Sequence, residues 1–278
     1  MQKIELSAGT IEYEDTGGSG PVVVLLHGLL MDGSEWRHVV RELHATYRCI
    51  VPTLPVGGHR LPMRADADLS LLGLARLQAE FLEALDLREV TLVGNDLGAF
   101  LATAGEHPER LARLVITSCE AFENIPSGLP GHTISLAAKI PGGLNAMVVQ
   151  PLRIRAMRRL PIALGPMTKR PIPHEITDAW LRPLFSQKEV RRDLLKYLRH
   201  SSKADLLAAT KSLSSFKRPA LVVWTPEDRM IPPANGKRLA ALLPQARLVE
   251  IADSFTLIPL DQPEKLAHVI HQFIQDTP

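Results

Sequence analysis

The chain has 278 residues, of which 45% are hydrophobic and 22% charged, and its formal net charge is +2. These values fit a globular protein built around one large domain, and they argue against a nucleic-acid-binding protein or an acidic tail. Two cysteines are too few for a disulfide framework, and no apolar run approaches the roughly 18 residues of a membrane span. We therefore expect a cytoplasmic monomer or homodimer without a nucleic-acid or membrane partner.

The first half of the chain alternates short apolar runs with helical patterns. We predict strands at 4–6, 10–14, 22–26, 49–52, 90–93 and 114–117. Helices are predicted at 34–46, 69–87 and 96–106, the first of them capped by Ser34. Alternating strands and helices indicate a parallel sheet with right-handed crossovers, and hence an α/β fold.

This alternation stops at about residue 122 and resumes at about 216. The intervening stretch is helical and proline-rich, without a convincing strand. Strands follow at 220–224 and 247–251, with helices at about 234–243 and from about 263. We predict an α/β core formed by residues 1–121 and 216–278, with a helical cap at 122–215.

One part of the predicted cap is rich in basic residues. Residues 150–200 hold twelve Lys and Arg against four Asp and Glu, including the run RIRAMRRL. We interpret this as the solvated face of amphipathic helices. A surface for an acidic ligand or a membrane is the alternative.

The motif with the clearest chemical meaning is GNDLG, residues 94–98, which follows the strand VTLV. A strand, then Gly-x-nucleophile-x-Gly, then a helix forms a strained turn that exposes the central side chain above the sheet. Here that side chain is Asp96, where serine is more usual. The helix N-terminus favours a negative charge at this position. An N-cap role for Asp96 is the simpler alternative, but it does not account for both flanking glycines.

With this motif the chain resembles the α/β-hydrolase fold, in the branch of haloalkane dehalogenases and epoxide hydrolases. The resemblance also covers the pair His27–Gly28, the stretch SEWR, PEDRMIPP after a late strand, and LDQPEKLAHVI near the end. It implies a mostly parallel, eight-stranded sheet flanked by helices, with a helical cap between the sixth and seventh strands.

The resemblance implies a two-step hydrolysis. Asp96 would attack an electrophilic carbon without needing a base, because a carboxylate is already ionised at neutral pH. Water activated by a histidine would then hydrolyse the ester. The backbone amides of Leu29 and Leu97 would form the oxyanion hole. Asp228 and Glu120 match the two positions that the family uses for the acid that orients the histidine.

The histidine itself is missing from its expected place. The stretch reads DSFTLIPLDQP, and Thr256 stands where the family has histidine. Threonine cannot act as a base near neutral pH. His268 and His271 are expected on a surface helix. His59, after the fourth strand, is either a further candidate to reach the site or a loop histidine.

The side chains expected to recognise substrate also depart from the family. Leu29 and Leu97 lack the N–H donors that hold a halide, and Tyr197 is the only tyrosine in the cap, where epoxide hydrolases use two. An apolar pocket is expected, favouring a small uncharged substrate. Its predicted wall comprises Leu29, Leu30, Trp36, Leu97, Phe122, Trp180, Phe255 and Leu257.

Three functions therefore remain open. The protein is a hydrolase whose water is activated by His59 or a carboxylate, a lyase or isomerase in which Asp96 acts as acid or base, or a ligand-binding relative without activity. A histidine replaced on purpose to trap the ester fits less well, because Phe255 also departs from the family's glycine. We favour the hydrolase. No metal or organic cofactor is expected, since neither ligand spacing nor a phosphate loop is present.

Overall fold

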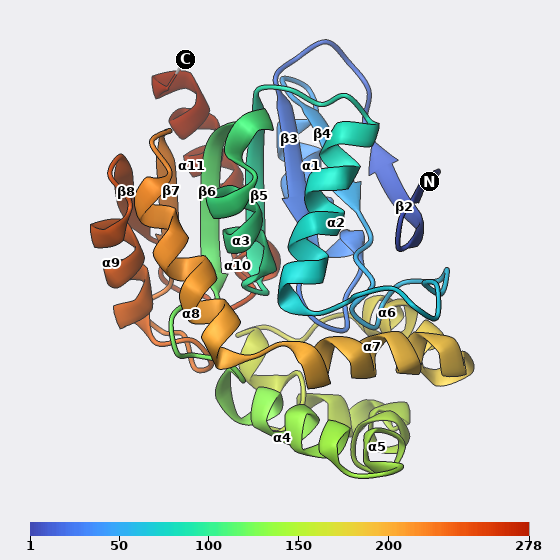
Figure 1. Ribbon diagram of the computed structural model, residues 1–278. Coiled ribbons are helices and arrows are strands. Elements are labelled where there is room, and N and C mark those ends of the chain that lie inside the picture. The colour runs from blue at the N-terminus through green and yellow to red at the C-terminus, as the bar shows by residue number, and fades with distance from the viewer. Residues whose placement is uncertain (278) are drawn as a thin grey trace.

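The fold is built on one eight-stranded sheet, seen in a computed structural model that describes residues 1–277 (Figure 1). The strand order is β1-β2-β4-β3-β5-β6-β7-β8. Strand β2 pairs antiparallel with both of its neighbours, β1 and β4. All other neighbouring strands in the sheet pair parallel. The bounds are β1 Gln2–Leu6, β2 Gly9–Asp15, β3 Val22–Leu26, β4 Arg48–Pro52, β5 Val90–Asp96, β6 Leu111–Cys119, β7 Ala220–Trp224 and β8 Ala246–Glu250. The predicted α/β class and the mostly parallel, eight-stranded sheet are confirmed.

Helices cover both faces of the sheet. On one face, α2 (Leu71–Ala84), α3 (Ala99–Glu106), α8 (Lys203–Ser212) and α9 (Pro233–Leu242) enclose the larger apolar core. On the other, α1 (Arg37–Leu43) and α11 (Pro263–Asp276) enclose a second core. Strands β3 and β7 are apolar along their whole length because both of their faces are buried.

Two predicted helices differ from the structure. The one predicted from Asp96 begins at Ala99, because β5 extends through Asp96, whose φ of 63° is incompatible with a right-handed helix. The one predicted at 34–46 is a 3₁₀ turn, Gly33–Trp36, followed by α1. Its cap is Asp32, which accepts from the Ser34 amide, rather than Ser34.

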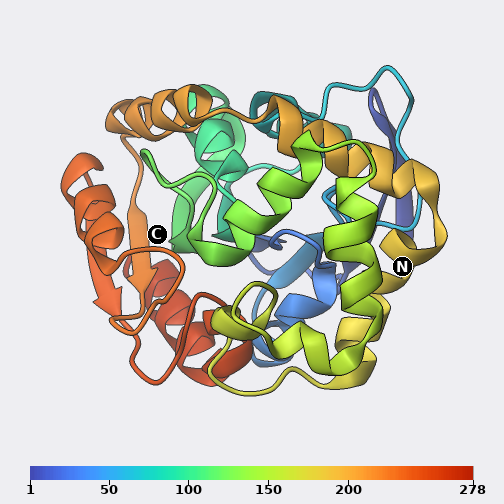
Figure 2. The ribbon, with the colours of Figure 1, turned by 90° about the horizontal axis from the view of Figure 1, so that it is seen from below.

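A layer of helices lies beyond the carboxyl ends of the parallel strands, between β6 and β7 (Figures 1 and 2). It contains α4 (Gly128–Lys139), α5 (Gln150–Arg153), α6 (His174–Ser186) and α7 (Lys188–His200), joined by short 3₁₀ and π-helical turns. These helices share an apolar core of their own, which includes Ile134, Val149, Leu184 and Leu194. We call this layer, residues 128–200, the cap.

The last helix of the predicted insertion has a different environment. α8 packs against α3, and its Leu206 belongs to the core beside the sheet. The division into 1–121 with 216–278 and 122–215 remains a prediction for folding units. Within residues 1–277, no helix is both long and apolar enough to cross a membrane.

Candidate active site

The turn after β5 holds Asp96 in a left-handed conformation, with φ 63°. A non-glycine residue rarely adopts this region, and such strain is concentrated at functional sites. Glycine is required on both sides of Asp96, because neighbouring atoms approach the backbone too closely there to leave room for a Cβ. A Cβ on Gly94 would meet the Phe100 ring, and one on Gly98 would lie 2.7 Å from the Glu120 carbonyl oxygen. The structure thus has the geometry of the predicted nucleophile elbow.

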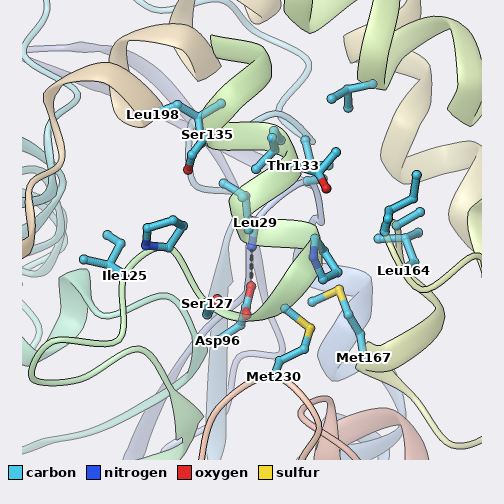
Figure 3. Close-up of a pocket in the computed structure, with 18 of the residues that line it drawn as sticks. Leu29, Asp96, Ile125, Ser127, Thr133, Ser135, Leu164, Met167, Leu198 and Met230 are labelled. Carbon is cyan, nitrogen blue, oxygen red and sulfur yellow. Dashed lines mark hydrogen bonds between the residues drawn. The ribbon is translucent and has the colours of Figure 1, made fainter. Parts of the chain in front are cut away.

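The Asp96 carboxyl group is buried, and Oδ2 accepts a hydrogen bond from the Leu29 amide at 2.9 Å (Figure 3). A Cβ on Gly28 would lie 2.6 Å from the same oxygen, which explains glycine there. Burial raises the pKa of Asp96 to about 6, against the lowering effect of the Leu29 bond. At neutral pH the carboxyl group is therefore largely ionised but poorly solvated, which favours its action as a nucleophile.

The two amides predicted for the oxyanion hole have different surroundings. The Leu29 amide donates to the Asp96 carboxylate. It therefore already faces the group on which negative charge would develop if an ester of Asp96 were hydrolysed. The Leu97 amide donates to the Asn95 carbonyl oxygen at 2.7 Å, within the turn itself. Both residues line the pocket. Of these two amides, only that of Leu29 is bonded to the Asp96 carboxyl group in this conformation.

Asp96 opens into a cavity of about 420 Å³ between the sheet and the cap. Figure 3 shows Met230 and Ser127 beside Asp96, with Thr133 and Ser135 across the cavity. Most lining side chains are apolar. The lining carboxyl groups are those of Asp96 and Glu120, and basic side chains occur at Lys139, Arg199 and Lys203.

The predicted pocket wall is only partly found at the cavity. Leu29, Leu30 and Leu97 line it, whereas five aromatic and aliphatic residues do not: Trp36, Phe122, Trp180, Phe255 and Leu257.

Each of these five residues packs elsewhere. Trp36 lies in the core beneath α11, and Trp180 donates its indole N–H to the Ser34 hydroxyl at 2.8 Å. Phe122 lies under the Arg238 guanidinium, Phe255 under that of Arg229, and Leu257 is fully buried in the larger core. Apolar character alone could not distinguish these core positions from the pocket wall.

Glu120 directly follows the last residue of β6 and lines the pocket. Its amide donates to the Asp96 carbonyl oxygen at 2.8 Å, which ties the ends of the two strands together. Burial, followed by the charge of Asp96, raises the pKa of Glu120 to about 8. Within the described chain, Glu120 Oε2 and the hydroxyl of buried Tyr197 both lack hydrogen-bond partners, and both residues line the cavity. They are the polar groups best placed to meet a substrate next to Asp96.

Asp228 and Thr256 form a pair behind the cavity. The Thr256 hydroxyl donates to Asp228 Oδ1 at 2.8 Å, and the amides of Met230 and Ile231 donate to the same oxygen at 2.9 Å. Burial raises the pKa of Asp228 and these bonds counteract the rise. Thr256 is fully buried, and neither residue lines the pocket. The hydroxyl fills the place expected of a histidine and binds the acid, but it contributes no group that can take a proton from water.

His59 is also outside the cavity. It is buried, with Nε2 3.3 Å from Asp193 Oδ2 of α7, while the Gly57 amide donates to Nδ1 at 3.3 Å. Asp193 in turn accepts from the Met63 amide and from Arg192. The imidazole therefore joins the loop after β4 to the cap. His271 likewise bonds Tyr47 at 2.9 Å, and His268 is exposed on α11.

Two polar residues of the site were missed by sequence reasoning. Asn95, inside the motif, donates through Nδ2 to the carbonyl oxygens of Thr117 and Thr256 at 3.2 and 3.0 Å, tying the elbow to β6 and to the Thr256 loop. Glu35 is fully buried and accepts from the Gly28 amide at 2.9 Å. Burial raises the pKa of Glu35 to about 8, with the charge of Asp96 adding to the rise. A carboxyl group at the start of a predicted helix gives no sequence signal of such burial.

Metal-binding side chains are not gathered at any point of residues 1–277, where no three His, Cys, Asp or Glu groups could hold one ion. The expectation that no metal or organic cofactor takes part remains a prediction.

Comparison with known proteins agrees with the fold. Residues 23–269 match the Alpha/beta hydrolase family. The chain is 26% identical over 278 residues to the uncharacterized hydrolase YugF of Bacillus subtilis (strain 168), covering 99% of this chain and 98% of the relative. It is 24% identical to a haloalkane dehalogenase of Mesorhizobium japonicum, with 99% and 91% covered. A crystal structure of a putative ancestral haloalkane dehalogenase superposes with a TM-score of 0.80 at 20% identity, covering 99% of each chain. The chain belongs to the alpha/beta hydrolase family.

Proposed function

We propose that this protein is a hydrolase in which Asp96 attacks a small, apolar electrophile to form an ester on the enzyme. The observation that carries the proposal is the placement of Asp96. Its carboxyl group is held on a strained turn, faces a cavity of about 420 Å³, and bonds the Leu29 amide. A haloalkane dehalogenase among the relatives supports chemistry at a carbon that carries a leaving group.

Among such electrophiles, a strained cyclic ether such as an epoxide fits the polar groups best. Opening the ring requires a proton for the leaving oxygen, and Glu120, whose pKa is about 8, carries one at neutral pH. Asp96 forms a C–O bond as the ring C–O bond breaks, and the ring oxygen takes the Glu120 proton. The Tyr197 hydroxyl lies in the same cavity and can bind that oxygen.

The second step uses the Glu120 carboxylate that the first step leaves behind. Esterified Asp96 has no charge, so the effect that raises the pKa of Glu120 through Asp96 is removed. Glu120 then takes a proton from a water molecule that attacks the ester carbonyl carbon, while the Leu29 amide stabilises the oxyanion. The ester C–O bond breaks, the leaving alkoxide takes the proton of the hydroxyl group that the water added, and the diol departs, which restores the Asp96 carboxylate and the protonated Glu120.

The test combines intact-mass measurement with product analysis on a panel of small epoxides, haloalkanes and activated esters. We expect epoxide turnover in the natural protein and neither turnover nor adduct in Asp96→Asn, because an amide is a poor nucleophile. An adduct that requires Asp96 but does not turn over would support the nucleophile and contradict the role of Glu120 as base. Turnover that persists in Asp96→Asn would contradict the proposal.

A non-hydrolytic acid/base enzyme is the second candidate, favoured by the pKa of about 6 of Asp96, which suits proton transfer near neutral pH. It predicts Asp96-dependent turnover of a substrate without any ester on the protein.

A further inference from the structure

The outer part of the cap has an unusual charge distribution. Residues 124–174 hold seven Lys and Arg and no Asp or Glu, so the rest of the chain has 25 basic residues against 30 acidic ones. Among described residues, three of the seven form no ion pair: Lys139, Arg153 and Arg159. All three are exposed. This region therefore presents a concentrated positive charge on a chain that is otherwise slightly negative.

The same region carries nearly all of the exposed large apolar side chains. Seven of the eight such residues in the described chain lie between 129 and 162, and the eighth is Met1. The seven are Leu129, Leu136, Ile140, Met147, Ile154, Leu160 and Ile162. Leu129 and Leu136 lie seven residues apart in α4, which places them along one side of the helix, and Ile140 follows directly after its end. Large apolar residues gathered on a surface in this way mark an interaction site.

Basic and apolar residues alternate closely in sequence. Ile154, 57% exposed, lies between Arg153 and Arg155, and Leu160 follows Arg159 directly. We call the exposed apolar and basic residues of 129–162 the cap surface. In Figure 1, α4 and α5 lie furthest from the sheet, and Figure 2 looks onto this side of the molecule. The cap surface therefore forms an outer face of the molecule.

The cavity is continuous with this surface. Met147, Leu160 and Ile162 are exposed and also line the cavity that leads to Asp96. A molecule resting against the cap surface would thus lie at an apolar entrance to the site.

The charge of the cap surface distinguishes between two partners that could cover it, a second copy of the chain and an anionic lipid surface. A second copy docked through the same face would bring its unpaired cations against those of the first, and no carboxylate of residues 124–174 could compensate. An anionic lipid surface offers the complementary charge together with an apolar layer for Leu136, Ile140 and Ile154. Interleaved basic and apolar side chains are typical of segments that bind in the plane of such a surface.

We propose that the cap surface docks on anionic membranes, so that the entrance of the cavity opens toward the lipid. This contact is peripheral and involves no spanning helix, and it differs from our expectation that the basic face is only solvated. It would supply the site with apolar substrates that are concentrated in lipid. The proposal does not depend on Asp96 being a nucleophile, since lipid binding is measured without turnover.

The test is co-flotation of the full chain with vesicles of phosphatidylcholine alone or with about one third phosphatidylglycerol. We expect binding to the anionic vesicles only, weakened as salt rises because exposed charges are screened. Arg153→Glu with Arg159→Glu should weaken binding by about tenfold or more. The matched control, Lys211→Glu with Lys217→Glu, changes the net charge equally outside the cap, at the end of α8 and just before β7, and it should still bind.

A second variant tests the apolar contribution without altering charge. Leu136→Ser with Ile154→Ser changes two side chains that are more than half exposed and do not line the cavity, so it should fold normally and lose binding. Absence of flotation with anionic vesicles would overturn the proposal, as would equal weakening by the control pair. A concentration-dependent dimer that Leu136→Ser with Ile154→Ser abolishes would instead assign the cap surface to a second copy of the chain.

Discussion

The elbow and the loop that contains Thr256 lie next to each other, yet their carboxyl groups differ in what they face. At the elbow, Asp96 has a strained backbone and faces a cavity, and its carboxyl group accepts one hydrogen bond, from the Leu29 amide. Glu120 beside it has one carboxyl oxygen without a partner. At the loop, Asp228 Oδ1 accepts three hydrogen bonds, one of them from Thr256. Asp228 Oδ2 is also without a partner in the described chain, but neither Asp228 nor Thr256 reaches the cavity. Asp96 and Glu120 thus face the cavity in which a substrate would bind. Thr256, at the position where the family is expected to have its histidine, makes a structural contact with Asp228 instead.

The largest expected effect comes from Glu120→Gln, which removes the acid and base that we assign to the cavity. Turnover should fall by about 10² to 10⁴-fold, the usual contribution of general acid–base catalysis. Formation of the Asp96 ester, followed by intact-mass measurement, should slow as well, because the variant also lacks the acid of the first step. The matched control is Glu123→Gln, at an exposed carboxylate that pairs with Arg238, where turnover should change by less than about twofold. Equal rates in Glu120→Gln and the natural protein would remove Glu120 from the mechanism.

A second large effect is expected from Glu35, the buried carboxyl group beneath the Gly28 turn. Because its pKa is raised from 4.5 to about 8, the folded state keeps a proton that the unfolded state releases. Its contribution to stability is therefore present below about pH 4.5 and is lost as the pH rises toward 8. Glu35→Gln cannot titrate, so its free energy of unfolding should exceed that of the natural protein by up to about 4 kcal/mol at pH 8, with little gain near pH 5. Urea unfolding at the two pH values measures this, and an equal shift at both would contradict it.

The pH dependence of kcat/KM should follow the two carboxyl groups at the cavity. The first step needs ionised Asp96, with a pKa of about 6, and protonated Glu120, with a pKa of about 8. The rate should therefore rise as the pH passes 6 and fall above about 8, by about tenfold per unit outside this window. A profile that keeps rising through pH 9 would show that Glu120 does not act as an acid.

The smallest expected effect is at Thr256. Thr256→Val removes the hydroxyl that donates to Asp228, so the free energy of unfolding should fall by about 1–2 kcal/mol while turnover changes by less than about threefold. Thr91→Val is a matched control, because the Thr91 hydroxyl is buried without a partner, and that change should be neutral or stabilising. If Thr256→Val lowered turnover as much as Glu120→Gln does, Thr256 would have a chemical role, and the proposed difference between the elbow and the Thr256 loop would be wrong.

The sequence predicted the sheet and the elbow because both depend on local patterns. Apolar runs such as 22–26 and 220–224 coincide with strands, and two glycines around Asp96 require a sharp turn. The pocket wall was harder to predict. Trp180 and Leu257 are apolar and fall in segments that surround the site, yet they pack into the core. Which apolar side chains face a cavity depends on tertiary packing, and the same holds for His59, whose partner Asp193 is 134 residues away.

The central claim is that oxygen from Asp96 is transferred to the product. A single turnover in H₂¹⁸O, with protein in excess over a small epoxide, tests it most directly. We predict a diol that contains only ¹⁶O after the first turnover and ¹⁸O in the peptide that contains Asp96, because water attacks the ester carbonyl carbon. Direct appearance of ¹⁸O in the diol, with an unlabelled Asp96 peptide, would contradict the nucleophilic role of Asp96.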